Sequence, residues 1–238
     1  MRIKSKLLTS ALRGVSLLLI ASQSLAATVS VEITNLTHGS YFTPLLVAAH
    51  SDTTHLFEVG TIATDGIQEM AEGGSIATLS TEATDAGSVV SENPAGGLLA
   101  PAQYTSITDF DTLTNTHLSI TAMVLPSNDG FVGLDGWEIP TTAGTYTLFL
   151  NAYDAGTEAN NELVADGSGA AGILGIPANP GANGGSNGTG VTTTEANNNV
   201  HIHRGVLGDT DLEGGTSDLD SRIHRWLNPV AKVVVTVQ

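Results

Sequence analysis

The 238-residue sequence contains no cysteine, which excludes disulfides, thiolate catalysis and cysteine-based zinc or iron–sulfur sites. A chain of this length can bury an adequate core without covalent cross-links. Lys and Arg are scarce, whereas Gly, Thr, Asn and Ser are frequent. This composition favours an extracellular all-β protein over a helical bundle.

Basic residues number only eight against 24 Asp and Glu, and four of the eight lie in the first 26 residues. Without that segment the chain has a formal net charge of −20. Such a surface repels nucleic acid and anionic lipid and attracts cations. The alternative explanation of the same charge is solubility alone.

Residues 1–26 have the organisation of a secretory signal peptide. Arg2, Lys4 and Lys6 precede an apolar run around residues 17–20, and small residues at 24–26 predict cleavage near Ala26. The apolar run is too short to span a bilayer comfortably, and no later run is long enough to cross one. We therefore expect a secreted protein, periplasmic or released, with no transmembrane segment in the mature chain; an uncleaved anchor is the alternative.

Apolar and polar residues alternate in several stretches, and this pattern predicts strands. A short helix is expected over residues 67–72, ended by Gly73 and Gly74, with another helical turn near residues 75–82. The chain length indicates one domain, residues 28–238. Within it, residues 165–199 are a Gly- and Asn-rich insertion that we expect to be a flexible loop. The strands are expected at 29–34, 45–49, 117–124, 146–153, 200–203 and 230–237.

Two acidic turns follow strands of this pattern: Leu125–Asp129 and Tyr153–Glu158. A strand of eight residues spans about 26 Å, and the connection over residues 126–144 is long enough to return that far. The two turns would then lie at the same end of the fold. A direct hairpin would instead place them at opposite ends.

Turns that contain Pro or Gly allow several oxygen atoms to converge on one point, as a hard cation requires. The carboxylates of Asp129, Asp154 and Glu158, with turn carbonyls and water, could supply the six to eight oxygens that calcium takes. The alternative is that Asp129 and Asp154 only accept hydrogen bonds from their own turns, as Asp commonly does.

The sequence resembles the spondin domain, the module found in F-spondin, mindin and related bacterial secreted proteins. The resemblance rests on several short motifs that together extend over about residues 28–238. They are Val31–Thr37 with Phe42-Thr43-Pro44, Pro126–Leu134, Tyr153–Glu158, His201–Gly205 and Trp226–Ala231.

The resemblance implies an antiparallel eight-stranded β-sandwich like the calcium-dependent membrane-binding domains, with short helices and long loops. It also implies a calcium site at Asp129 and Asp154, and Glu158 stands where animal members have a third aspartate. Gly130 stands where they carry a tryptophan, and their cysteines are absent, so animal partners do not transfer. The expected function is a secreted, non-catalytic, calcium-binding module for adhesion or for an extracellular protein or glycan ligand.

Three other patterns suggest alternative sites. Residues 209–220 imitate the spacing of a calcium-binding EF-hand loop, although they also fit a solvated acidic loop. His201 and His203 share a strand face, and His224 could complete a zinc triad of a secreted metal-dependent hydrolase. Arg222, Arg225 and Trp226 form either a small binding patch or a cover for the core edge. A metal-free structural envelope protein is the remaining alternative.

Overall fold

The computed structural model describes residues 27–238, so the predicted signal peptide and its cleavage site lie outside the described residues. Strands make up 33% and helices 8% of the structure, and every strand pair is antiparallel except for isolated bridges. The predicted all-β, antiparallel class is therefore confirmed.

Ten strands and two helices form the described part of the chain. In chain order they are β1 (Thr28–Asn35), β2 (Tyr41–Phe42), β3 (Leu46–His50), α1 (Asp65–Gly73), α2 (Ala77–Asp85), β4 (Val89–Glu92), β5 (Tyr104–Asp111), β6 (His117–Leu125), β7 (Gly130–Glu138), β8 (Gly144–Asp154), β9 (His201–Ile202) and β10 (Ala231–Val237).

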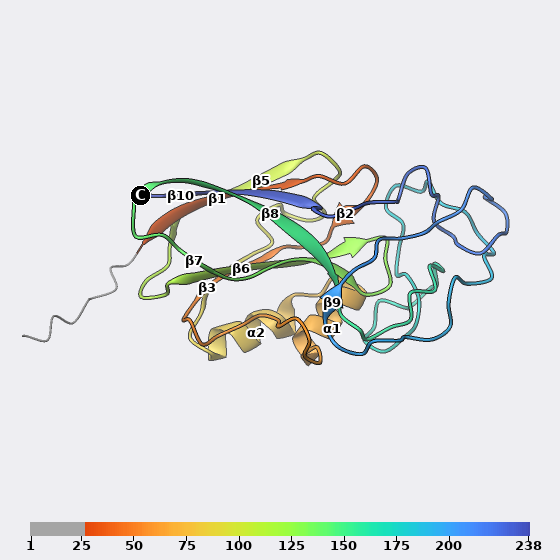
Figure 1. The fold of residues 1–238 in the computed structure, drawn as a ribbon, viewed down its shortest axis with the longest axis horizontal. Helices are drawn as coiled ribbons and strands as arrows, with labels where there is room; N and C mark the ends of the chain where they lie inside the picture. Colours follow the sequence, from red (N-terminus) through yellow and green to blue (C-terminus); the bar gives the residue numbers. More distant parts are fainter. Residues whose placement is uncertain (1–26) are drawn as a thin grey trace, which may run out of the picture.

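Hydrogen bonding joins the strands into one nearly closed, barrel-like sheet in the order β4-β3-β6-β7-β8-β10-β1-β5. Strands β5, β1, β10 and β8 form one layer, and β7, β6 and β3 form the other (Figure 1). Strand β8 connects the layers because residues 144–150 pair with β10 and residues 151–154 pair with β7. The eight-stranded β-sandwich that the resemblance implies is therefore not confirmed, because the strands of the two layers belong to one sheet that folds over on itself.

The space between the layers holds the larger core. Val29, Val31 and Ile33 of β1 face it with alternate residues of β10 and β6. A second core lies between the β3–β6–β7 layer and the helices, where Met70 of α1 packs with Met123 and Phe131. Strand β6 is therefore buried on both faces, whereas β1 and β10 alternate between core and solvent.

Both predicted helices are present. Helix α1 begins after Thr64, whose hydroxyl accepts a hydrogen bond from the backbone N–H of Ile67, and ends at Gly74 in the left-handed conformation (φ 73°). The α1–α2 pair covers the outer side of the β3–β6 layer (Figure 1). The helices bury the second face of β6. The polar residues that alternate with apolar ones in this strand are therefore buried as well and do not face solvent.

Besides the two-residue β2, three strands were missing from the sequence prediction: β4, β5 and β7. Residues of β5 are mostly polar because this strand lies at an edge of the sheet. Residues 130–138 of β7 contain glycines, which weaken the strand signal. Strand β7 is the return segment that the 126–144 connection required, and it runs between β6 and β8.

The insertion at residues 165–199 lies among the loops at one end of the sheet (Figure 1). Two buried carboxylates bind this loop region through backbone N–H groups. Glu162 accepts hydrogen bonds from Leu207 N and Gly208 N, and from the Ser217 hydroxyl. Asp218 accepts from Val164 N and Gly188 N. The flexibility of the insertion stays a prediction.

We predict that Glu162→Gln destabilises the protein by about 2–4 kcal/mol, because an amide nitrogen replaces one accepting oxygen and charge-assisted hydrogen bonds are lost. Urea unfolding measures the change. Glu213→Gln is the control, since Glu213 is exposed in the neighbouring loop and should shift stability by less than about 0.5 kcal/mol. Equal effects of the two substitutions would refute the anchoring role of Glu162.

Candidate functional site

The two acidic turns meet at the same end of the sheet, as the long connection predicted. Asp129 directly precedes β7, and Asp154 is the last residue of β8. Gly130 and Asp154 are register partners, and the backbone N–H of Ala155 donates to the carbonyl of Asp129 over 3.1 Å. Residues 25 positions apart in the chain are therefore neighbours across one β-ladder.

The carboxylate of Asp129 is fully buried. Its Oδ2 accepts hydrogen bonds from the backbone N–H groups of Thr157 (2.8 Å) and Glu158 (3.1 Å). Its Oδ1 has no hydrogen-bond partner. Asp129 thus binds the other acidic turn rather than its own, and one of its oxygens remains free for a further ligand.

Asp154 is 2% exposed and is satisfied mainly within its own turn. Its Oδ1 accepts from Gly156 N (2.9 Å), and its Oδ2 accepts from the side-chain amide of Asn160 (2.7 Å). The hydrogen bonds of Asp154 therefore fit the alternative in which the aspartate accepts hydrogen bonds from its own turn.

Glu158 is 4% exposed. Its Oε2 accepts from the Asn128 amide (3.3 Å) and from Gly175 N (3.0 Å), whereas its Oε1 has no partner. Asn128 and Asn160 support the site and were not among the predicted site residues. Asn128 stands next to Asp129 in the first turn, and Asn160 follows Glu158 by two positions, so proximity in sequence was the available signal.

Burial raises the pKa of all three carboxyl groups. For Asp129 the pKa rises well above its usual value, first through burial and then through the negative charge of Asp154. Burial also raises the pKa of Asp154, and it raises the pKa of Glu158 to about 7. A raised carboxyl pKa means that the charged form lacks compensation, so a cation would favour ionisation here.

The donor set fits a hard cation: carboxylate and amide oxygens, two of them buried without partners. Among residues 27–238, however, no three His, Asp or Glu side chains converge closely enough to hold an ion by themselves. A calcium ion at this position would therefore also need carbonyl or water oxygens.

The family model for the spondin N-terminal domain, Spondin_N, matches residues 34–165, more than half of the chain. The chain belongs to the spondin N-terminal domain family. Members of this family are extracellular. The match includes Asp129, Asp154 and Glu158, and ends before the motifs at residues 201–205 and 226–231. A search of curated proteins found no match.

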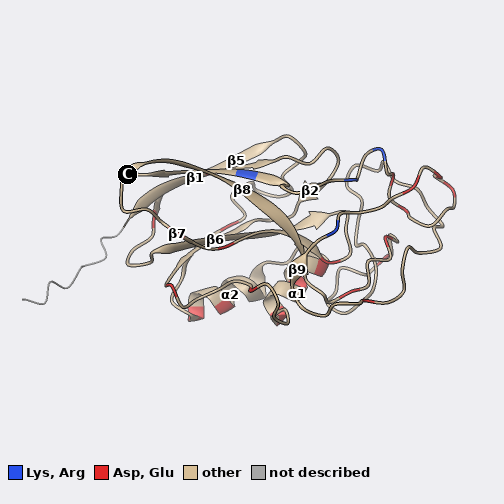
Figure 2. Cartoon of the chain, in the orientation of Figure 1, with Lys and Arg blue, Asp and Glu red and all other residues tan. Residues whose placement is uncertain are grey.

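Within residues 27–238 of this spondin-family chain, no helix is long and apolar enough to cross a membrane. Its acidic residues gather on the helices and the loop end, and basic residues are few (Figure 2). The cleft beside Asp154 has a volume of about 300 Å³ and is lined by Asn160, Glu195, His201 and Arg204, among others. Of the three predicted site residues, only Asp154 lines this cleft.

The three histidines of the alternative zinc site do not come together as a metal-binding group within the described residues. His203 is buried; its Nδ1 accepts from Gly205 N and its Nε2 lies 3.1 Å from the Asn160 amide oxygen. Burial lowers the pKa of His203 to about 3, so it is neutral. His224 Nδ1 accepts from Asp220 N. The Nε2 atoms of His201 and His203 each lie 3.8 Å from Asp154 Oδ2.

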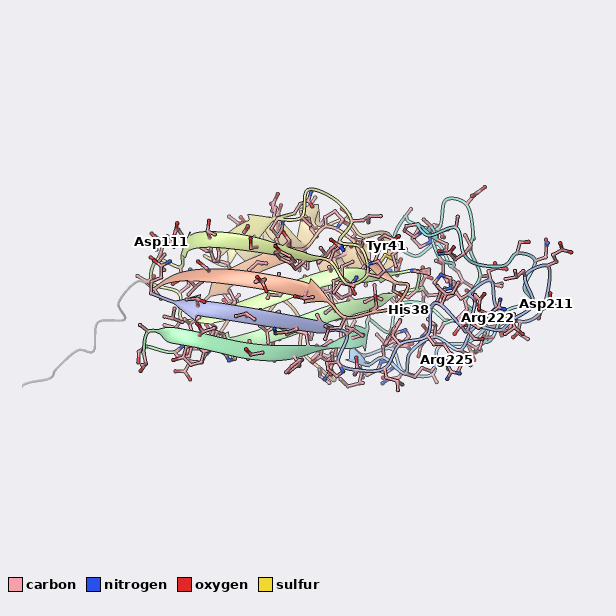
Figure 3. The ribbon with its side chains drawn as sticks, turned by 90° about the horizontal axis from the view of Figure 1, so that it is seen from above. His38, Tyr41, Asp111, Asp211, Arg222 and Arg225 are labelled. Atoms are coloured by element: carbon pink, nitrogen blue, oxygen red, sulfur yellow. The ribbon has the colours of Figure 1, made fainter. Side chains whose placement is uncertain are left out.

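The EF-hand-like loop at residues 209–220 is closed by its own hydrogen bonds. Asp209 accepts from the backbone N–H groups of Asp211, Thr216 and Ser217. At the other end, Asp220 pairs with Arg222 over 2.6 Å. These hydrogen bonds favour the alternative of a solvated acidic loop, which lies at the far end of the molecule near Asp211 (Figure 3).

The three residues of the predicted patch have different surroundings: Trp226 is buried, whereas Arg222 and Arg225 are exposed. Trp226 is 7% exposed and belongs to the core between the layers. Arg222 is bound to Asp220, and Arg225 is exposed. The position of Trp226 thus fits the alternative of a cover for the core edge.

We predict that Asp220→Asn destabilises the protein at pH 7 but not at pH 2. Hydrogen bonds from Arg222 lower the pKa of Asp220 to about 2 from its usual 3.8. The folded protein thus favours the ionised group, and its contribution is present above about pH 4 and disappears as the pH falls through 2. Urea midpoints from pH 2 to 7 measure this.

The matched control is Asp211→Asn, because Asp211 is exposed in the same loop. A stability difference between Asp220→Asn and the unchanged protein that persisted undiminished at pH 2 would contradict the ionic role of Asp220.

Proposed function

We propose that this protein is an extracellular, non-catalytic ligand-binding or adhesion module whose binding end is stabilised by calcium. Asp129 and Asp154 would hold the ion, and Glu158 would provide a third carboxylate. The observation that carries the proposal is the pair of buried oxygens without partners, Asp129 Oδ1 and Glu158 Oε1. A buried carboxylate oxygen is normally hydrogen-bonded or bound to a cation.

The charge balance supports a cation rather than an internal ion pair. Within residues 27–238, no Lys or Arg side chain forms a salt bridge with any of the three acids. His203 lies 3.8 Å from Asp154 but is neutral. Within the described residues, Asp129 and Glu158 therefore have no ion-pair partner, and besides the neutral His203 only His201, whose Nε2 lies 3.8 Å away, stands beside Asp154.

Calcium would supply a positive charge between two turns that are joined otherwise by hydrogen bonds. Asp129 already connects the turns through Thr157 and Glu158. A cation beside its free Oδ1 would stabilise the same contact and hold Asp154 at the floor of the cleft. An extracellular protein or glycan ligand that entered this cleft would then meet a rigid, polar surface.

Membership of the spondin family supports the extracellular and non-enzymatic parts of the proposal. The competing hydrolase depends on a histidine triad, and two of its histidines use their Nδ1 atoms to accept backbone hydrogen bonds. The likeness to calcium-dependent membrane-binding domains stays a prediction.

We predict that calcium raises the melting temperature of the protein and that Asp154→Asn removes most of this increase. A ligand at 100 times its Kd stabilises the folded state by about 2.7 kcal/mol, which corresponds to about 5 to 10 °C for a domain of about 200 residues. Differential scanning calorimetry with calcium chloride or with a chelator measures the increase.

Asp111→Asn provides the matched control, since Asp111 is an exposed aspartate at the opposite end of the sheet (Figure 3). This variant should retain the full calcium effect. Identical melting of the unchanged protein in calcium and in chelator would reject the calcium site and would favour a metal-free structural protein.

A further inference from the structure

Besides the cleft at Asp154, the protein has a groove beside the segment that joins β3 to α1. The groove consists of two pockets with volumes of about 80 Å³ and about 270 Å³. His55, Leu56 and Thr64 line both pockets, so the two adjoin. Of the described residues that line the groove, none belongs to the proposed calcium site. The groove is therefore a separate surface feature.

The inner side of the groove is apolar. Leu56, Leu79 and Ala83 line the larger pocket and are buried in the core between the sheet and the helices. Ile67 of α1 and Val200, both buried in the same core, line the smaller pocket. Concave surfaces lined mainly by hydrophobic side chains bind apolar groups of a ligand.

Two large apolar side chains of the adjoining loop are exposed. Ile62, which lines the smaller pocket, is 76% exposed, and Val59 is 58% exposed. Phe57 fixes this loop on the protein, because its ring packs against Phe131 and Tyr153 with ring centres 5.0 Å and 4.9 Å away. The loop thus keeps apolar surface in water beside an apolar groove, and a partner that covered this surface would be stabilised by its burial.

Negative charge surrounds this apolar surface. Glu58 lines the smaller pocket, and Glu82 lines the larger one. Asp65 and Asp85, each next in sequence to a lining residue, are exposed. No Lys or Arg occurs between residues 27 and 203 of the sequence. Figure 2 accordingly shows acidic residues on both helices and no basic residue there.

The acids of the groove have no compensating positive charge. The Glu82 carboxylate accepts hydrogen bonds from two groups at the start of α1. His55 is the lining residue that can carry a positive charge, and its Nδ1 lies 2.7 Å from Asp135 Oδ2. In the described part of the chain, neither Glu58 nor Glu82 has an ion-pair partner. The groove thus combines an apolar floor with a negative rim.

We propose that this groove binds a cationic amphipathic peptide segment of an extracellular partner. Apolar side chains of that segment fill the two pockets and cover Ile62 and Val59, and its Lys or Arg side chains face Glu58 and Glu82. Charge complementarity selects this class of partner, because a second copy of the acidic chain or an anionic surface would bring like charge to the same place. The site is separate from the calcium site and does not depend on it.

Isothermal titration calorimetry at physiological salt tests the proposal with a synthetic amphipathic peptide of leucine and lysine. We expect this peptide to bind, and the Val59→Ser/Ile62→Ser double variant to bind it at least about tenfold more weakly, because the apolar surface that the peptide covers is lost. Leu227→Ser is the matched control. Leu227 is 83% exposed and does not line the groove, so this substitution should leave Kd unchanged.

Glu58→Gln tests the electrostatic part of the proposal. Removal of this charge should weaken binding of the lysine peptide about two- to fivefold. Glu213→Gln, at an exposed glutamate of the 209–220 loop, should not change Kd. A peptide with glutamate in place of lysine should not bind.

Three outcomes would overturn the proposal. Equal affinity of the Val59→Ser/Ile62→Ser variant and the unchanged protein would show general attraction to an acidic surface rather than binding in the groove. Absence of binding by the lysine peptide, or equal binding of the glutamate peptide, would exclude a site for cationic segments. Self-association of the unchanged protein that this double variant loses, measured by sedimentation equilibrium, would show that a second copy covers the groove.

A further measurement needs no substitution. Amide chemical shifts in nuclear magnetic resonance locate the lysine peptide on the unchanged protein. We expect the largest changes in residues 54–64 and 79–86, which contain most of the lining of the groove. The largest changes at the two acidic turns or in the 209–220 loop would place the peptide elsewhere and would overturn the proposal.

Discussion

Burial of carboxylates in a chain with almost no basic residues is the constraint on which the loop end of this protein depends. Arg204, Arg222 and Arg225 are exposed, and Lys232 is half-buried. None of them pairs with the buried acids near the β7–β8 junction. Negative charge inside this end must therefore be compensated by backbone N–H groups, amide side chains or external cations.

In the long loops, backbone N–H groups compensate the negative charge of the buried carboxylates. Glu162 binds residues 207–217, and Asp218 binds residues 164 and 188. A Gly- and Asn-rich segment has few apolar side chains to bury, so a central carboxylate that gathers N–H donors can replace a hydrophobic core locally. The carboxylates of the acidic turns also accept hydrogen bonds from backbone N–H groups. However, two of their oxygens have no hydrogen-bond donor.

The sequence predicted those elements whose pattern reports directly on burial. Strands β1 and β10 alternate cleanly because one face lies on the core and the other on solvent. Strand β7 escaped prediction because Gly130, Gly133 and Gly136 interrupt its pattern. The glycine at 133 has a packing reason: a Cβ there would come within 2.6 Å of the Phe57 ring. Contacts between distant residues, such as Glu72 with the 172–175 loop, leave no local pattern at all.

Gly130, which follows Asp129, lies so close to its neighbours that a side chain would not fit without a shift. A Cβ at this position would lie 2.7 Å from the Ser127 hydroxyl and 3.1 Å from the ring of His203. Ser127 in turn accepts from Gly130 N and so shapes the first acidic turn. His203 in turn packs against Trp226 with ring centres 4.9 Å apart, and its Nε2 lies 3.1 Å from the amide oxygen of Asn160. Because the side-chain amide of Asn160 also donates to Asp154, the close approach of Gly130 to His203 connects the first acidic turn with the far side of the second.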